Sequence, residues 1–456
     1  MRPMYCAKPS FLLNTRADLA VVEKYHEKYS RIDAILDKNP EILEAVHADL
    51  RNKMGSLKGR EADYSSEMLF RMLLIKCIEQ LSFRDLVVRV NDSSFLRNFA
   101  RIGWGEVMNF TVLDAAWKCL DDTTWDVINE YLFKYASRED LISGTDLRTD
   151  STVCESNIHF PTDSSLLWDC YRVIARTMRQ IEGSNNKYSM YFRFHDKKIK
   201  KLHTFISTQA GRKQLSTIRN VKRAMKLLVE RVEDLINKGA LFIAHAREMR
   251  LSQDCIEPLE LLLENAQYVT EQARRHGING EMVSAKERLF SIFEEHAELL
   301  KRGKAQKPVE FGHLVTLAQT REKFISYYAI DEISTPDTEQ KDKALENHKK
   351  QFGVYPERFT ADKNYHVSVE DTHQWEKKVS VFSVGKKGNR SLQETEREHS
   401  EPFRMMQRFR AGCEGSISVL KRAFGLRRSL YRGFKSFASS ICRLVFCHNL
   451  VLLATK

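Results

Sequence analysis

The sequence is poor in the two residues that most often interrupt regular structure. Of its 456 residues only 19 are glycine and 9 are proline. Long flexible linkers and closely spaced β-turns both depend on such residues, so their scarcity argues against either feature. We therefore expect helices to dominate in a chain long enough for two or three domains.

Cysteine is present, but not in a pattern typical of zinc sites or disulfide frameworks. The nine cysteines are scattered, and no Cys-x-x-Cys pair occurs. The one close group, Cys442, Cys447 and His448, lies in an apolar run, where buried thiols are the ordinary explanation. We expect a reduced, cytosolic protein.

A long uninterrupted apolar run is also lacking. Residues 1–16 contain no apolar core of a signal peptide. The most apolar stretch, residues 441–454, is interrupted by Arg443, His448 and Asn449 and is too short to cross a bilayer. We therefore expect no membrane partner.

Charge is unbalanced toward the basic side. Lysine and arginine number 73 against 61 acidic residues, which gives a net charge of +12. Such an excess favours a polyanionic partner, nucleic acid first and anionic lipid second. Residues 404–435 contain nine basic residues and a single acid, Glu414, and we interpret this stretch as a DNA-binding track. A second basic stretch, interleaved with aromatic residues, lies at 187–231.

Residues 16–135 have the pattern of successive helices. Apolar residues recur at helical spacing over 64–80, and Ser82-Phe-Arg-Asp85 has the form of a capping box that opens the next helix. Thr111-Val-Leu-Asp114 repeats that form before a third helix. The pattern predicts a helical N-terminal domain, residues 1–138, for DNA binding or dimerisation, although small helical bundles of any purpose look alike.

The remaining residues, 139–456, are predicted to form an α/β domain with a mixed sheet. β-branched residues predict strands, and apolar residues at i, i+3, i+4 and i+7 predict helices. Strands are expected at 141–154, 309–317, 324–330, 358–362 and 379–384, and helices at 216–238, 256–275, 282–302 and 340–352 and over the last seventy residues. Residues 160–305 would then be a helical insertion after the first strand.

Three acidic residues stand out by their position. Asp150 lies in the first strand, Asp362 at the end of a later strand, and Glu414 on a late helix, separated by 212 and 52 residues. Carboxylates are the ligands that magnesium prefers, and two such ions about 4 Å apart can catalyse phosphodiester chemistry. Among 61 acidic residues, a solvated surface group is the commoner explanation for any one. Asp146, on the same strand face, is a rival to Asp150.

The surroundings of Glu414 strengthen the case for this residue. Arg410 and Lys421 lie at positions i−4 and i+7 from Glu414, so all three share one helix face. A carboxylate flanked by cations on one face can hold a metal ion while its neighbours bind phosphates.

Three motifs resemble those of one family. They are Thr149-Asp150-Ser-Thr-Val, Ala361-Asp362-Lys-Asn-Tyr-His, and Gly412-Cys-Glu414 through Lys421 with Arg-x3-Glu-x6-Lys spacing. Together they resemble the DDE transposases of bacterial insertion sequences, whose catalytic domain has an RNase H-like fold. The resemblance covers roughly residues 60–455. Gln407 stands where the family often has a tyrosine, and the insertion follows the first strand instead of the last.

The resemblance implies a fold and a complete site. The fold would be an α/β RNase H-like mixed sheet with a large helical insertion, preceded by the all-α N-terminal domain. Asp150, Asp362 and Glu414 would be the catalytic residues and would hold two Mg²⁺ ions, for which Mn²⁺ is expected to substitute. The implied DNA-binding residues are Arg410, Lys421, Arg422, Arg427 and Arg428.

The resemblance also implies a function and its partners. A DNA transposase would cleave the ends of an insertion sequence and join the 3′ hydroxyls to target DNA. Its partners would be double-stranded terminal inverted repeats and target DNA, bound as a homodimer in the bacterial cytoplasm at the nucleoid. Two alternatives stay open: a catalytically inactive, transposase-derived DNA-binding protein, and an RNase H-like nuclease that cleaves without joining.

Overall fold

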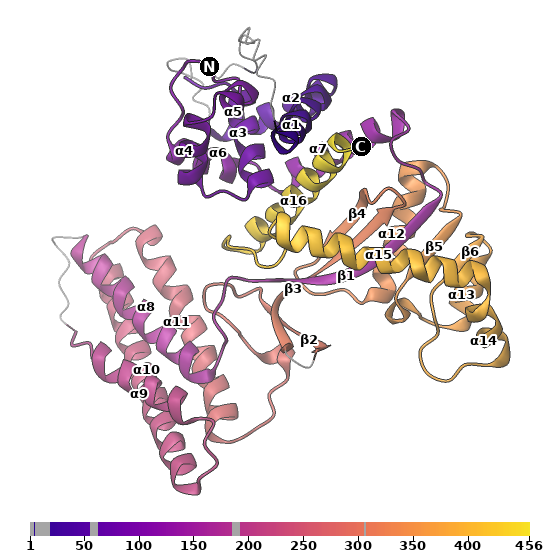
Figure 1. Cartoon of the computed structure of the whole chain (residues 1–456). Helices are drawn as coiled ribbons and strands as arrows, with labels where there is room; N and C mark the ends of the chain where they lie inside the picture. Colours follow the sequence, from indigo (N-terminus) through magenta and orange to yellow (C-terminus); the bar gives the residue numbers. More distant parts are fainter. Residues whose placement is uncertain (1–3, 5–18, 55–62, 185–191, 305–306) are drawn as a thin grey trace. The chain divides into compact units, whose positions relative to one another are not determined.

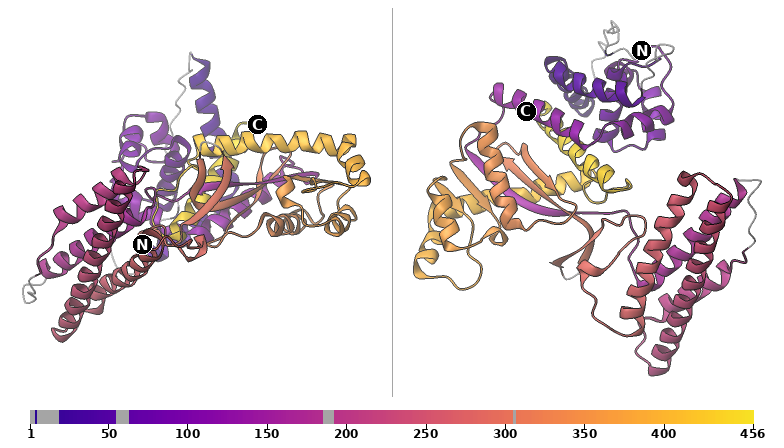
Figure 2. Two further views of the ribbon diagram at one scale, coloured as in Figure 1. Left: turned by 90° about the horizontal axis from the view of Figure 1, so that it is seen from below. Right: turned by 180° about the vertical axis from the view of Figure 1, so that it is seen from behind.

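The structure is a computed structural model that describes residues 4, 19–54, 63–184, 192–304 and 307–456. The chain divides into two compact units, one formed by residues 1–155 with 313–456 and the other by residues 156–312. Figures 1 and 2 show the elements of each unit from three sides. The first unit is mixed α/β, with a helical N-terminal region and a mixed sheet. Residues 187–191 of the second predicted basic stretch lie outside the described residues.

The N-terminal region is helical, as predicted. Its helices are α1 (Ala20–Lys38), α2 (Pro40–Met54), α3 (Ser66–Glu79), α4 (Phe83–Asn91), α5 (Ser94–Phe99), α6 (Phe110–Cys119) and α7 (Asp122–Arg138). Ser82 caps α4 as predicted, because its hydroxyl accepts a hydrogen bond from the backbone N–H of Asp85 at 3.1 Å. The predicted cap at Thr111 is wrong: the side chain of Asn109 caps α6, and Thr111 lies inside the helix.

Buried charges join the first helices to one another. The guanidinium of Arg71 on α3 is only 2% exposed and forms ion pairs with Glu67 at 3.0 Å and with Asp33 of α1 at 2.6 Å. Arg101 also pairs with Glu67, at 3.4 Å. A buried guanidinium is tolerated only when paired, so these contacts hold α1 against α3 and the segment that follows α5.

The sheet of the first unit is mixed. Its strands are β1 (Asp146–Glu155), β3 (Lys307–Thr320), β4 (Ile325–Ile330), β5 (Arg358–Ala361) and β6 (Val381–Ser383). β1 lies between β3 and β5; β1 pairs with β5 and β5 with β6 in parallel, whereas β3 pairs with β4 in antiparallel fashion. The predicted hairpin of β3 and β4 is therefore confirmed. β3 begins in the second unit and continues into the first.

Helices cover both faces of this sheet. α12 (Asp337–Phe352) packs against one face, where Ala344 and Leu345 join Leu147 and Phe359 in a buried core. α15 (Glu401–Ala423) crosses the opposite face, as Figures 1 and 2 both show. The other elements of this part of the chain are the 3-10 turn η3 (Lys363–Tyr365) and helices α13 (Val369–Glu376), α14 (Leu392–His399) and α16 (Phe434–Ala454).

The C-terminal helix α16 is the most apolar one described. It begins at Phe434, seven residues before the predicted apolar run, so by length and composition alone it could cross a membrane. In the structure, however, 83% of its most apolar window is buried against the rest of the chain. The core helix of a globular protein can have the same length and hydropathy, so these two properties are weak evidence for a membrane span.

The second unit is mainly helical. It contains α8 (Asp163–Gly183), α9 (Asp196–Gln209), α10 (Leu215–Glu248), α11 (Gln253–Ala273), the π-helical turn η1 (Arg274–Ile278), the 3-10 turn η2 (Ala285–Glu287) and strand β2 (Glu298–Lys304). The helix predicted at 282–302 is wrong. The chain there is irregular and then forms β2, which pairs with the first half of β3. Its apolar residues, among them Phe290 and Ala297, instead pack in a small core with Ile158 and Phe311.

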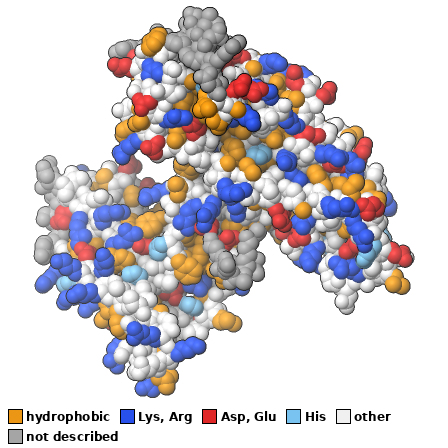
Figure 3. Space-filling model, viewed as in Figure 1, with side chains coloured by type: hydrophobic (Ala, Val, Ile, Leu, Met, Phe, Trp, Pro, Cys, Tyr) orange, Lys and Arg blue, Asp and Glu red, His pale blue; other side chains and the backbone are white. Residues whose placement is uncertain are grey.

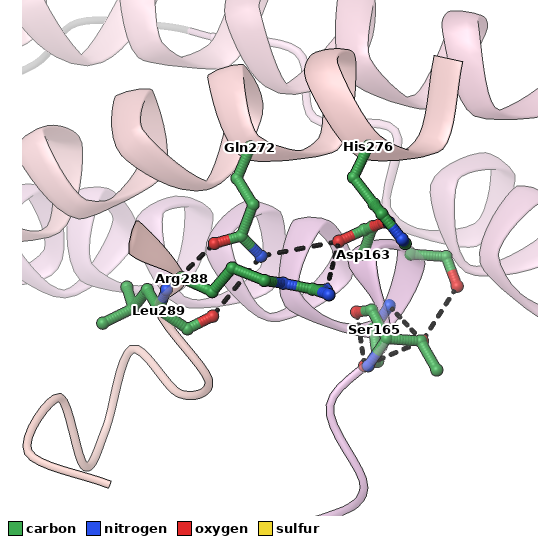
Figure 4. A network of polar contacts seen from close by, with 8 residues as sticks. Asp163, Ser165, Gln272, His276, Arg288 and Leu289 are labelled. Carbon is green, nitrogen blue, oxygen red and sulfur yellow. Dashed lines mark hydrogen bonds and ion pairs between the residues drawn. The ribbon is translucent and has the colours of Figure 1, made fainter. Parts of the chain in front are cut away.

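A polar network anchors this irregular segment. The buried carboxylate of Asp163 accepts hydrogen bonds from His276 Nδ1 at 2.5 Å and from Gln272 Nε2 at 3.4 Å, and it forms an ion pair with Arg288 at 3.3 Å (Figure 4). The Gln272 Oε1 atom accepts the backbone N–H of Leu289 at 2.9 Å. The first turn of α8 and the end of α11 thereby hold the chain that leads to β2.

Candidate active site

Two of the predicted carboxylates follow matching positions on neighbouring strands. β1 and β5 are parallel and pair Thr149 with Ala361; Asp150 is the next residue of β1, and Asp362 is the first residue after β5. Neighbouring strands lie about 4.8 Å apart, and the two aspartates are therefore adjacent at the sheet. Both are partly buried. Asp150 Oδ1 also accepts the backbone N–H of Ser151 at 2.8 Å.

Both aspartates point to the face that α15 covers. Successive side chains of a strand alternate between the two faces of a sheet. Leu147 of β1 and Phe359 and Ala361 of β5 belong to the core on the α12 side. Asp150 and Asp362 lie an odd number of residues from these positions, so they face α15, the helix that carries Glu414.

A buried arginine holds α15 against β1 close to Asp150. Arg148, two residues before Asp150, is 3% exposed and donates to the carbonyl oxygen of Phe409 at 3.0 Å and to Ser416 Oγ at 3.3 Å. Its Nε and Nη2 also donate to Gln319 Oε1 at 3.2 and 2.9 Å. Gly412 lets the helix approach this closely, because a Cβ there would overlap Arg148 Nη1.

Gln407 fixes the earlier part of α15 and contacts Arg410. Gln407 Nε2 donates to the carbonyl oxygen of Ser383 at 2.8 Å and to Thr360 Oγ1 at 3.3 Å. Its Oε1 accepts a hydrogen bond from Arg410 Nε at 3.2 Å. Because Thr360 lies two residues before Asp362, this amide connects the second aspartate's strand to the predicted phosphate-binding arginine.

Cys413, next to Glu414 on α15, is buried against the sheet. Its pKa is raised to about 12, mainly by burial; the charge of Arg148 lowers it, that of Asp150 raises it, and Arg410 and Glu414 act in the same two directions. Cys413 Sγ lies 3.9 Å from Gln319 Oε1, the atom to which Arg148 also donates. Cys413, which precedes Glu414 in the chain, is therefore packed where α15 meets the sheet.

The predicted cationic face of α15 is present. The helix is continuous from Glu401 to Ala423, so Arg410, Glu414 and Lys421 lie along one side of it. Glu414 is exposed, whereas Arg410 and Lys421 are partly buried. This side borders the face of α15 that packs on the sheet.

The cations after Lys421 lie farther from the aspartates. Arg422 is exposed in the last turn of α15. Arg428 forms an ion pair with Glu155 at 3.0 Å, and the carbonyl oxygen of Arg427 accepts the backbone N–H of Glu155 at 3.1 Å. Glu155 lies five residues beyond Asp150 on β1, about 17 Å along an extended strand. The structure therefore groups Arg427 and Arg428 with the far end of β1.

Tyr365 joins the two aspartate motifs on the sheet's other face. Its buried hydroxyl lies 2.6 Å from Ser151 Oγ, a contact in which either hydroxyl can donate. Ser151 follows Asp150, and Tyr365 ends the short turn that follows Asp362. Burial raises the pKa of Tyr365 well above its usual value, so this group stays protonated.

The three carboxylates do not form a ready metal cage in this conformation. Among the described residues, no three His, Cys, Asp or Glu side chains lie close enough together to hold one ion. Asp150 and Asp362 adjoin on the sheet, whereas Glu414 is exposed on α15. The donor set nevertheless suits Mg²⁺, because all three residues offer carboxylate oxygens.

Asp146, the rival to Asp150, is already engaged in structural contacts. It is 2% exposed and forms ion pairs with Arg358 of β5 and, at 2.9 Å, with Arg321. Two cations thus balance its charge and align the beginnings of β1 and β5.

The sequence pointed to the acids but not to the residues that support them. Arg148 and Gln407 were not predicted as site residues, and Tyr365 appeared only as the aromatic residue after Asp362. One signal was available: an arginine inside a strand of otherwise buried residues needs partners from another element.

One family model matches this chain. The model described as "Transposase domain (DUF772)" matches residues 19–115, from α1 into α6. No curated protein and no solved structure matches the chain. The match supports a transposase and a role in transposition, and it falls in the helical N-terminal region, not on the sheet.

Proposed function

We propose that this protein is a DDE transposase with an RNase H-like catalytic domain. It cleaves the ends of an insertion sequence and joins the freed 3′ hydroxyls to target DNA. The observation that supports this most strongly is the parallel register of β1 and β5, which sets Asp150 beside Asp362 under the helix that bears Glu414. The transposase-domain match at residues 19–115 supports the same class of protein.

Each carboxylate has a role in this proposal. Asp150, Asp362 and Glu414 would together hold the metal ions through their carboxylate oxygens. Two Mg²⁺ ions, or Mn²⁺ in their place, would supply Lewis-acid activation of the attacking oxygen and would stabilise the leaving one. Glu414 is exposed on α15, so its carboxylate would have to turn toward the aspartates when the ions bind.

The cations of α15 orient the DNA. Arg410 and Lys421, on the Glu414 side of the helix, contact phosphates next to the cleaved bond. Gln407 keeps the Arg410 guanidinium in place through its 3.2 Å hydrogen bond. Arg422, Arg427 and Arg428 extend the track toward the end of β1, where they contact phosphates farther along the duplex.

A second basic surface supports double-stranded DNA as the partner. Ten exposed cations and no acid occur between residues 197 and 229, and none forms an ion pair with a described residue. Figure 3 shows lysine and arginine gathered over the part that Figure 1 labels α9 and α10. The ten are Lys197, Lys198, Lys200, Lys201, Arg212, Lys213, Arg219, Lys222, Arg223 and Lys226.

The α10 cations form a stripe that suits a duplex backbone. Arg219, Lys222, Arg223 and Lys226 follow i, i+3, i+4 and i+7 spacing, so they lie on one side of the helix over about 10 Å. A solvated helix face usually mixes charges of both signs, and this one does not. The protein would act as a homodimer that bridges two DNA ends at the bacterial nucleoid.

A strand-joining assay tests the proposed chemistry. Purified protein is incubated with labelled terminal-repeat DNA, a target plasmid and Mg²⁺. Asp150→Asn, Asp362→Asn and Glu414→Gln should each abolish cleavage and joining while duplex binding stays within about twofold. Glu357→Gln is the matched control, because Glu357 is an exposed acid just before β5, and this variant should keep full activity.

Each outcome of this assay separates the candidates. Full activity in any of the three variants would remove that residue from the site. Cleavage without joined products would indicate a nuclease. Binding without breakage would indicate an inactive DNA-binding relative, which is the second candidate because Glu414 lies outside any three-residue cluster in the described chain.

The salt dependence of binding tests the α10 stripe. Each phosphate contact contributes about 0.9 to the slope of log K against log salt concentration. Changing Lys222, Arg223 and Lys226 together to glutamine should therefore lower the slope by about 2.7. The control triple variant changes three cations of the same unit that are already paired with acids: Lys238, Arg247 and Arg274. Equal slopes in the two triple variants would exclude the stripe as a DNA contact.

A further inference from the structure

A cavity in the first unit lies outside the proposed catalytic site. It has a volume of about 290 Å³ and is lined by the end of α3, by α6, by the loop after α15 and by α16. Three of its lining residues are cations, Lys76, Arg428 and Arg443, and no aspartate or glutamate lines it. Asp150, Asp362 and Glu414 do not line it either.

Arg443 is a buried cation without a carboxylate partner among the described residues. Its side chain is 3% exposed, and its guanidinium stacks on the ring of Trp117, with Cζ 3.3 Å from the ring centroid. Nη2 donates to Ser439 Oγ at 2.9 Å, but Nε and Nη1 have no hydrogen-bond partner within the described chain. Aromatic stacking compensates only part of the desolvation of such a charge.

Lys76 adds a second cation to the same wall. Its ammonium lies 4.5 Å from the centroid of Trp117 and 4.8 Å from that of Phe83, and it forms no ion pair with a described residue. Burial lowers the pKa of Lys76; the nearby Cys77 and Cys447 raise it, whereas the positive charge of Arg443 lowers it. The two cations therefore destabilise each other, and a bound anion would relieve both.

We infer that this cavity is a binding site for a phosphate group, held by Lys76 and Arg443 with Arg428 at the rim. A phosphate monoester carries a charge of about −1.5 to −2 at pH 7, which matches two unpaired cations better than a carboxylate does. The remaining volume, beside Leu81, Leu430 and Tyr431, accommodates the organic part of the ligand. Arg428 is already paired with Glu155, so it contributes less.

Two sources can supply such a phosphate. One is a free nucleotide, and the other is the 5′ phosphate at the end of a DNA strand. Both offer the same dianion attached to a sugar, and both suit a cavity of this size. The probes are therefore adenosine 5′-monophosphate, adenosine as the uncharged control, and a 20-base-pair duplex with and without 5′ phosphates.

Binding is measured on the full-length chain by titration calorimetry and by tryptophan fluorescence, because Trp117 lines the cavity. Lys76→Gln and Arg443→Met should each weaken binding of the phosphorylated probe about tenfold to a hundredfold. Lys28→Gln is the matched control: Lys28 is also a partly buried lysine over aromatic rings, 4.9 Å from the Tyr29 centroid, but it lies outside the cavity. This variant should bind as the wild type does.

The outcomes decide between the sources and can overturn the inference. Binding of the nucleotide but not of the phosphorylated duplex identifies a small-molecule site, and the reverse identifies a strand-end site. The inference is wrong if no phosphorylated probe binds more tightly than its unphosphorylated counterpart, or if Lys76→Gln and a folded Arg443→Met both bind normally. The binding measurement does not depend on strand joining. If the proposed transposase chemistry fails, the phosphate site can still be tested, and if no phosphate binds, the strand-joining result still stands.

Discussion

Gly412 gives the sharpest test of how α15 is held at the site. A Cβ at this position would overlap Nη1 of Arg148 and lie 3.3 Å from its Cζ. Gly415, one turn further along the same helix, has no atom within 4 Å of the corresponding position. Substituting alanine at each glycine therefore makes the same chemical change in two environments.

The expected difference between the two variants follows from the contacts of Arg148. Alanine favours an α-helix over glycine by about 1 kcal/mol, so Gly415→Ala should stabilise the protein by about that amount. In Gly412→Ala the guanidinium must move away from Phe409 and Ser416, and it loses two hydrogen bonds worth about 1.5 kcal/mol each. After the helix gain, a net loss of about 2 kcal/mol remains, so the two variants should differ by about 3 kcal/mol.

Urea unfolding followed by circular dichroism measures this difference, and the strand-joining assay measures its consequence. Displacing α15 from β1 moves Glu414 away from Asp150, so Gly412→Ala should lose joining activity while Gly415→Ala retains it. If both variants have the same unfolding midpoint, the close approach of α15 to Arg148 does not exist in solution. If Gly412→Ala is destabilised but fully active, the position of α15 does not control the chemistry.

Two further predictions concern the two units separately. Burial lowers the pKa of His348 and of His448 to about 4, so between pH 4 and 6.5 the unfolded chain binds more protons than the folded one. The two buried histidines should therefore make their full contribution to the free energy of unfolding above pH 6.5. From pH 7 to pH 5 the free energy of unfolding should fall by about 2 kcal/mol per histidine. His448→Gln should remove about half of this fall if the variant folds. In the second unit, Asp163→Ala removes the hydrogen-bond acceptor of His276 and the ion-pair partner of Arg288. This change should destabilise the second unit by about 2–3 kcal/mol and speed proteolysis within residues 279–297. Equal cleavage rates in the variant and the wild type would contradict the anchoring role of Asp163.

Local patterns predicted most helices and strands of this chain. The apolar spacing over 64–80 became α3, and the β-branched segments became β1, β3 and β4. The prediction failed at 282–302, where apolar residues at helical spacing serve a small core around Phe311 and then an edge strand. The spacing of apolar residues shows which positions are to be buried, but it does not show against which part of the fold they pack.

The candidate site was predictable in its chemistry but not in its geometry. The acid at a strand end and the cations around Glu414 are visible in the sequence. The sequence did not show that Asp150 and Asp362 stand side by side, because that depends on a parallel pairing between strands more than two hundred residues apart. Glu414 is exposed on α15, and no three acids cluster among the described residues, so a closed metal cage was not visible in this conformation either.

The sequence by itself determined the local properties of this protein. These are the helical N-terminal region, the basic stretches on α10 and α15, and the acids in or just after strands. Charge and helical periodicity depend only on residues that are close together in the sequence. Only the tertiary structure decided which charges remain without a counter-ion. Arg71 pairs with Glu67 and Asp33, whereas Arg443 is buried with no carboxylate partner among the described residues, and that difference arises from packing between helices far apart in the chain.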